Sequence, residues 1–303
     1  MIPNRLKKGD KIGVIAPSSP VTEDKLQDIN NSITLMEASG FEVVFGKNVF
    51  KNTLGYGATA REKAEDINMM FKNPAVKAIF CATGGANSNS TFEYINYKLI
   101  KENPKILCGF SDSTSITNII TEKTGLITYS GATFKALTSW KTEYGYKQVI
   151  DKFVLGENVL AEENDKFETI QEGEAEGNLI GGNLSLIANL SSGTYCLDFT
   201  DKILFIEELS IESDSEMVSN SLYRMKQNGV FDKIKGIWVG NYDGAVALEK
   251  ILMDTLEDKY KFPIIKSNNF GHTEKKMVIP IGVKAQIDTT KDIKIKLLEK
   301  CIN

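Results

Sequence analysis

Short apolar runs alternate with amphipathic stretches along the first half of the chain. The apolar runs have the length of buried strands, and in the longer stretches apolar side chains recur every three or four residues, which predicts helices that bury one face. Strands are predicted at 11–16, 41–45, 78–81 and 106–109, and helices at 22–39, 59–71, 90–100 and 113–121. This alternation is typical of βαβ units with a mostly parallel sheet.

The pattern changes in the middle of the chain, where residues 157–176 are polar, acidic and weakly periodic. Apolar runs return after this segment: strands are predicted at 203–206, 236–239, 278–283 and 292–298, and a helix at 216–228. We therefore predict an α/β protein with an N-terminal Rossmann-like domain over 1–145, a linker or crossing segment over 146–176, and a second α/β domain over 177–303.

Composition and charge limit the function classes. The chain has 303 residues with 36 Lys and Arg against 40 Asp and Glu, so the formal charge is −4. A phosphate-binding surface needs an excess of basic residues, so we expect no nucleic-acid or membrane partner.

No apolar stretch approaches the ~20 residues that span a bilayer, and the run at 12–17 is too short for a secretory signal. The four cysteines are widely spaced, which predicts reduced thiols in a cytoplasmic protein without a zinc site.

The segment Gly109-Phe110-Ser111-Asp112-Ser113 follows one predicted strand and precedes a predicted helix. A serine on such a turn exposes its Oγ close to the free amides of a helix N-terminus, as an acyl-transfer nucleophile requires. The alternative is that Ser111 or Asp112 only caps the helix. Cys108 offers a thiol alternative, but its place inside an apolar strand predicts burial.

Two further segments carry candidate groups. The turn at 83–89 contains Gly84 and Gly85, whose backbones can approach a ligand closely, and also Asn87. Glu207 and Glu208 end an apolar strand, where α/β sites gather, although only one of two successive side chains faces a given site. Each segment also has a purely structural alternative. The turn at 83–89 could be a simple connection between strand and helix, and the two glutamates could be solvated charges at the end of a strand.

The single histidine, His272, lies in a glycine-flanked loop, a place where exposure is commoner than catalysis. Any mechanism that needs one imidazole must use this residue, and most histidine-rich metal sites are excluded. A serine nucleophile needs a base, and the base needs an orienting acid. Ser111, Glu207 and His272 could form such a set, although their order in the chain proves nothing by itself.

Taken together, these segments resemble the LD-carboxypeptidase family of serine peptidases, and more closely its microcin-immunity branch. The resemblance covers nearly the whole chain, and the matching blocks occur in the family's order. They are GDKIGVIAPSSP, TGGANSNS, CGFSDSTS, EGNLIGGNLSLI, ILFIEE, MKQNGVFDKIKGI and NFGHTEKKMVIPIGVKAQID.

The resemblance implies roles for particular residues. Ser111 matches the nucleophile, Glu207 the triad acid and His272 the base, while Gly85 and Asp112 match the backbone amides of the oxyanion hole. The polar side chains expected near a substrate are Asn87 and Asn183. The resemblance also implies a Rossmann-like domain carrying the serine, a smaller swivelling-type C-terminal domain carrying Glu207 and His272, a homodimer, and no metal or cofactor.

Two departures from the family pattern concern the support of the triad and the substrate. Glu208 stands where the family usually has Asp, and the segment between Phe134 and Gly177 is short beside the microcin-immunity branch, in which this region supplies an aromatic residue that stacks on a nucleobase. Trp140 and Phe167 are the candidates for that residue. Three functions remain open: a muropeptide L,D-carboxypeptidase, a self-immunity peptidase acting on peptidyl-nucleotide amides, and a non-catalytic two-domain binding protein.

Overall fold

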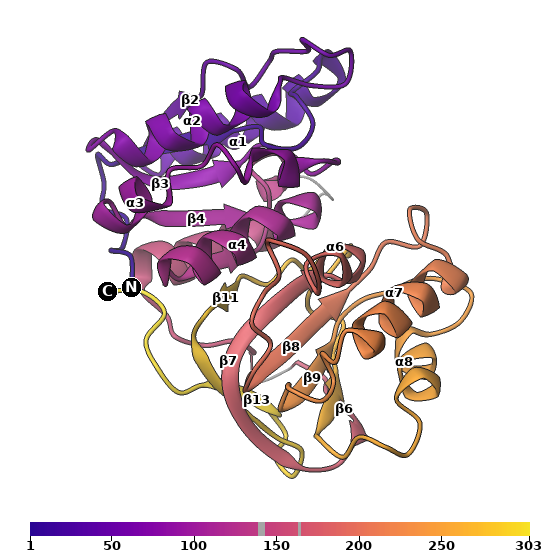
Figure 1. The fold of residues 1–303 in the computed structure, drawn as a ribbon. Helices are drawn as coiled ribbons and strands as arrows, with labels where there is room; N and C mark the ends of the chain where they lie inside the picture. Colours follow the sequence, from indigo (N-terminus) through magenta and orange to yellow (C-terminus); the bar gives the residue numbers. More distant parts are fainter. Residues whose placement is uncertain (139–142, 163–164) are drawn as a thin grey trace. The chain divides into compact units, whose positions relative to one another are not determined.

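The computed structural model describes residues 1–138, 143–162 and 165–303, which form two compact units. The first unit comprises Met1–Asn158, Met277–Pro280 and Cys301–Asn303, and the second comprises Val159–Lys276 and Ile281–Lys300. The two ends of the chain lie side by side in the first unit (Figure 1), because Asn303 exchanges backbone hydrogen bonds of 3.0 Å with Pro3 and Arg5. The predicted fold class, a parallel α/β sheet followed by a second α/β unit, is confirmed.

The sheet of the first unit has the order β11-β5-β4-β3-β1-β2, in which β1 to β5 are parallel. These strands are β1 (Lys11–Ile15), β2 (Glu42–Phe45), β3 (Val76–Cys81), β4 (Ile106–Gly109), β5 (Thr128–Ser130) and β11 (Ile279–Ile281). The first five therefore have the doubly wound order 2-1-3-4-5. In such sheets ligands bind beyond the carboxyl ends of the strands, near the point where the order reverses.

The helices of the first unit are α1 (Leu26–Ala38), α2 (Ala60–Lys72), α3 (Tyr97–Glu102), α4 (Thr114–Thr124) and α5 (Tyr144–Val149), with a π-helical turn at Ile150–Leu155. Right-handed crossovers place α1 on one face of the sheet and α2 to α4 on the other. The start of α2 is fixed by Thr59 and Glu62, which form the reciprocal capping box that the sequence predicts. The helix predicted at 90–100 begins only at Tyr97, because the Asn96 side chain caps it by accepting from Leu99 N.

The sheet of the second unit has the order β13-β12-β7-β8-β9-β10-β6, and its central strands β7 to β10 are parallel. Its elements are β6 (Glu168–Gln171), β7 (Glu174–Asn183), β8 (Lys202–Glu207), β9 (Gly236–Val239), β10 (Ile264–Lys266), β12 (Lys284–Asp288), β13 (Ile295–Leu297), α6 (Leu184–Asn189), α7 (Ser215–Gln227) and α8 (Leu248–Leu256). The acidic segment assigned to a linker contains β6, an edge strand antiparallel to β10. Half-exposed edge strands need no apolar run, so the sequence pattern did not reveal it.

Candidate active site

Ser111 stands at the tip of a tight turn at the carboxyl end of β4. The strand ends at Gly109, a 3₁₀ turn covers Ser111–Ser113, and α4 begins at Thr114. Ser111 is half-buried and has φ 60°, a left-handed conformation that costs a serine about 1 kcal/mol or more. Strain of this kind persists where the surrounding structure imposes it, as in the nucleophile elbows of hydrolases.

The glycine turn after β3 packs directly on this serine. A Cβ atom on Gly84 would lie 3.0 Å from the Cβ of Ser111 and 3.3 Å from its Oγ. Gly85 has φ +136°, and a Cβ atom there would lie 2.0 Å from the Oγ of Ser19 in the loop after β1. The structure therefore brings the predicted glycine turn and the predicted elbow together, since β3 and β4 are neighbours in the sheet.

Replacing Gly85 with alanine is expected to lower the free energy of unfolding by more than about 2 kcal/mol and to impair any activity at Ser111, because the new methyl group meets Ser19 and the backbone favours glycine. The control is Gly125→Ala at the end of α4, where φ is +72° but nothing lies within 4 Å of the new Cβ, so only about 1 kcal/mol should be lost. Denaturant unfolding of both variants measures the difference. Equal losses would show that the contact with Ser19 has no effect.

Asp112 ties the elbow to the glycine turn through buried hydrogen bonds. Its carboxylate accepts from Ser88 N at 2.9 Å, and its backbone carbonyl accepts from Ser88 Oγ at 2.8 Å. Asn87, one residue earlier, has φ 64°, and its Oδ1 accepts from Lys63 Nζ at 2.7 Å. Asn87 and Asp112 are among the residues predicted from the sequence, whereas Ser88 and Lys63 are not.

In the second unit, Glu207 and His272 form a tight pair. Glu207 ends β8 with no exposed surface, and its Oε2 lies 2.7 Å from His272 Nδ1 and accepts from His272 N at 3.1 Å. A carboxylate facing Nδ1 holds the proton there and makes Nε2 the basic atom of the ring. The two residues are 65 positions apart in the chain, and the structure brings them together as the predicted pair requires.

The loop that carries His272 is held close to β8. Gly271 has φ +113°, and a Cβ atom there would lie 3.0 Å from the Cβ atoms of both Glu207 and Asn241. Asn241 follows β9, and its Nδ2 donates to the His272 carbonyl at 3.2 Å. The position before the histidine therefore requires glycine, because its backbone has a positive φ and passes close to Glu207 and Asn241.

Glu208 has a different role from its neighbour. Its carboxylate is buried and accepts from Asn183 Nδ2 at 2.5 Å, from Ser185 N at 2.9 Å and from Leu209 N at 2.9 Å, with a further bond from Ser185 Oγ. Asn183 Oδ1 accepts from Leu186 N at 3.3 Å and so caps α6. Glu208 thus joins the end of β8 to the start of α6, and the amide of Asn183, a predicted substrate contact, makes these structural bonds.

Lys276 is a buried cation close to the pair. Its Nζ donates to the Gly271 carbonyl at 3.3 Å, and the side chain is 5% exposed. Burial lowers the pKa of Lys276 to about 8, although the charge of Glu207 acts in the opposite direction. Lys276 therefore holds its proton less tightly in the folded protein than in the unfolded chain.

This shift predicts a pH dependence of stability that Lys276→Met removes. Between pH 8 and 10 the unfolded chain binds more protons than the native state at this position, so the free energy of unfolding of the wild type should rise relative to the variant by about 1 kcal/mol per pH unit. Other buried lysines are present in both proteins and cancel in the difference. Denaturant unfolding at several pH values measures it, and a flat difference would contradict the shift.

The two thiols at the ends of the strands before the glycine turn and the elbow, Cys81 and Cys108, do not offer a competing nucleophile. Cys81 and Cys108 are fully buried, and burial raises the pKa of both, that of Cys81 to about 12. A thiol with a raised pKa carries little of the reactive thiolate. Within the described ranges of the chain, no group of three His, Cys, Asp or Glu side chains is placed to hold a metal ion.

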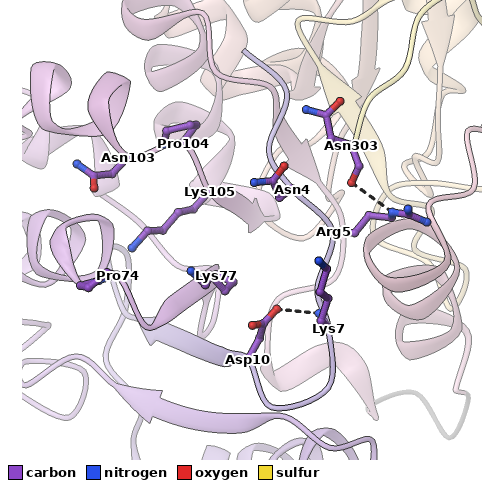
Figure 2. Close-up of a pocket in the computed structure, with 10 residues that line it drawn as sticks. All are labelled: Asn4, Arg5, Lys7, Asp10, Pro74, Lys77, Asn103, Pro104, Lys105 and Asn303. Atoms are coloured by element: carbon purple, nitrogen blue, oxygen red, sulfur yellow. Dashed lines mark hydrogen bonds between the residues drawn. The ribbon is translucent and has the colours of Figure 1, made fainter.

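A cavity of about 610 Å³ lies elsewhere in the first unit, at the amino ends of β3 and β4 (Figure 2). Its basic residues include Lys77 and Lys105, and Lys105 Nζ donates to the Met70 carbonyl in the last turn of α2 at 2.8 Å. Cations at the carboxyl end of a helix balance its dipole and unpaired carbonyls. Since Ser111 follows the opposite end of β4, this cavity is separate from the elbow.

Comparison with known proteins identifies the family of this chain. Models of the LD-carboxypeptidase N-terminal and C-terminal domains match residues 12–131 and 176–287. A Bacillus subtilis protein named "Probable murein peptide carboxypeptidase" is 32% identical, over 95% of this chain and 91% of its own. The chain belongs to the LD-carboxypeptidase family. It is a serine-type carboxypeptidase or amidohydrolase.

Other members of the LD-carboxypeptidase family share its whole architecture. The crystal structure of an MccF-like protein from Bacillus anthracis is 32% identical, with a TM-score of 0.87 over 98% of this chain and 99% of that one. The microcin C7 self-immunity protein MccF of Escherichia coli is 28% identical, over 93% and 92%. A structure of MccF in complex with glutamyl sulfamoyl guanosine is 25% identical, with a TM-score of 0.89 over 100% and 99%.

The remaining predictions concern a base-stacking aromatic residue, a homodimer, substrate contacts and the absence of a membrane span. Phe167 is half-buried and packs on Trp238, with ring centroids 6.4 Å apart, while Trp140 lies outside the described residues. The nucleobase-stacking role suggested for these two residues, the homodimer and the substrate contacts of Asn87 and Asn183 stay predictions. In the part of the chain that the structure describes, no helix has the length and apolar character needed to cross a membrane.

Proposed function

We propose that this family member hydrolyses an amide bond through a covalent acyl-enzyme on Ser111, with His272 as the base and Glu207 as its orienting acid. The observation that carries the proposal is the Glu207–His272 pair at 2.7 Å, in a chain whose strained Ser111 has the conformation of a nucleophile elbow. The triad requires His272 Nε2 to reach Ser111 Oγ when substrate is bound.

The chemical steps follow from these roles. His272 takes the proton from Ser111 Oγ as the oxygen attacks the carbonyl carbon, and Glu207 stabilises the imidazolium. The backbone amides of Gly85 and Asp112 donate to the oxyanion, each contributing roughly 2.7–4 kcal/mol in comparable sites. The C–N bond then breaks, and His272 protonates the leaving nitrogen. Water repeats the cycle on the acyl-enzyme, which releases the carboxylic acid and restores Ser111.

For the substrate, we propose an aminoacyl or peptidyl group joined to a nucleotide through an amide-type bond. The support is the similarity over the full chain to the MccF-like protein and to MccF, which has been crystallised with glutamyl sulfamoyl guanosine. A murein tetrapeptide is the second candidate, since the Bacillus subtilis relative named for murein peptides is 32% identical.

Side-by-side hydrolysis distinguishes the two substrates. Wild-type protein and Ser111→Ala would be incubated with glutamyl sulfamoyl adenosine and with an L,D-tetrapeptide, and products followed by mass spectrometry. We expect the wild type alone to release glutamate from the sulfamoyl adenosine, at a kcat/KM above that for the tetrapeptide. Cleavage of the tetrapeptide alone would overturn the nucleotide substrate in favour of the murein one, and cleavage of neither would overturn both.

A further inference from the structure

A buried lysine supports the turn that carries the proposed oxyanion hole. Lys63 projects from α2 and is 3% exposed, and its Nζ donates to Asn87 Oδ1 at 2.7 Å. A lysine is rarely buried to this degree without a partner that needs its charge or its donors. The reaction steps above do not use Lys63, so its burial needs a separate explanation.

Two residues connect Lys63 to the elbow. Asn87 holds φ 64° at the start of the 3₁₀ turn Ser88–Thr91, a conformation tolerated by asparagine and stabilised here by the bond from Lys63. Ser88, the next residue, donates both its N–H and its Oγ to Asp112. The bond from Lys63 to Asn87, the Asn87–Ser88 peptide bond and the bonds from Ser88 to Asp112 therefore form a network that ends one residue after Ser111.

The two ends of this network carry opposite charges. Asp112 is 4% exposed and Lys63 is 3% exposed, so the network joins a buried carboxylate to a buried ammonium. Burial lowers the pKa of Lys63, and the negative charge of Asp112 opposes that shift. In a low-dielectric interior each charge would be costly alone, and removal of one leaves the other uncompensated.

We propose that Lys63 is a positioning residue for the oxyanion hole. This inference rests on the proposed function, because it concerns the same serine. By anchoring Asn87, Lys63 fixes the backbone two residues after Gly85. Through Ser88, which donates to the carboxylate and to the carbonyl of Asp112, it also restrains that residue. Both proposed oxyanion donors thus depend on the ammonium group of Lys63, which acts on them through Asn87 and Ser88.

Donors that act on the developing oxyanion stabilise the transition state more than the bound substrate. Lys63→Met should therefore lower kcat about 10- to 100-fold while KM changes less than about 3-fold. The rate at which a fluorophosphonate labels Ser111 should fall in parallel, because that reaction uses the same donors. Lys63→Arg, which keeps a charged donor, should recover part of kcat.

The matched control is Lys72→Met, which removes an exposed lysine from the same helix. It should leave kcat and labelling unchanged. Asn87→Ala removes the acceptor and should lower kcat as Lys63→Met does, and the double variant should lose no more than the larger single loss. Should Lys63→Met fail to fold, Asn87→Ala and Lys63→Arg carry the test.

Unchanged kcat in Lys63→Met, or losses that add in the double variant, would overturn the role of Lys63. A parallel rise in KM would also overturn it, since that would indicate substrate binding. These outcomes differ from a failure of the proposed function, in which Ser111→Ala keeps its turnover and Ser111 takes no label.

Discussion

Ser111→Ala is expected to reduce kcat by about 10⁴-fold or more, because the variant lacks the hydroxyl oxygen that attacks the carbonyl carbon. The variant should keep its fold. Alanine meets the same left-handed backbone as serine, so the strain at φ 60° is unchanged. Steady-state turnover on the cleaved substrate of the side-by-side assay measures the loss, and thermal unfolding verifies the fold.

Two companion variants sharpen this test. Ser111→Gly should also be inactive, yet more stable than Ser111→Ala by about 1 kcal/mol, since glycine adopts positive φ without strain. Cys108→Ala should retain near-full turnover because its thiol is buried. Turnover that survives in Ser111→Ala and disappears in Cys108→Ala would replace the serine mechanism with a thiol mechanism.

Glu207→Gln is expected to lower kcat about 10³- to 10⁴-fold without removing any atom that touches substrate. The carboxylate oxygen Oε2 accepts from both the backbone N and the ring Nδ1 of His272. An amide in its place is neutral and can present a donor to Nδ1, which selects the wrong tautomer and no longer stabilises the imidazolium. The pH–rate profile and kcat of the purified variant measure the effect.

Glu208→Gln is the matched control, since it changes the adjacent buried carboxylate. Glu208 accepts four hydrogen bonds from Asn183, Ser185 and Leu209, so the variant should lose stability by about 1–3 kcal/mol but keep most of its turnover once folded. If both glutamine variants lost equal activity, Glu207 would have no special relation to His272 and the triad assignment would be wrong.

The fold could be predicted where elements carry their own periodicity. The buried runs that become β1, β3, β4 and β8 are apolar along their length, and the amphipathic stretches that become α1 and α2 repeat with the helical period. The half-exposed edge strand β6 has no such pattern. The return of residues 277–280 and 301–303 to the first unit depends on pairing with remote partners, which local sequence does not encode.

The candidate site also contains some residues that could be predicted from the sequence and others that could not. Ser111 was recognisable from its place between a strand and a helix, and His272 was recognisable as the only imidazole. Lys63 and Lys276 were missed because a lysine is normally solvated. For Lys63 one signal was available, since it lies at helical spacing from Ile67 and Met70 on the buried face of α2. A charged residue on an apolar helix face indicates either that the helix is wrongly assigned or that the charged group has a buried partner.

Covalent labelling of the serine tests the central claim most directly. The wild-type protein would be treated with a fluorophosphonate, digested and analysed by mass spectrometry, in parallel with Ser111→Ala and His272→Ala. We predict a single adduct on Ser111 that appears in step with the loss of hydrolysis, is absent from Ser111→Ala and forms far more slowly in His272→Ala. Hydrolysis that continues in fully labelled protein, or an adduct that forms equally fast without His272, would contradict a Ser111–His272–Glu207 mechanism.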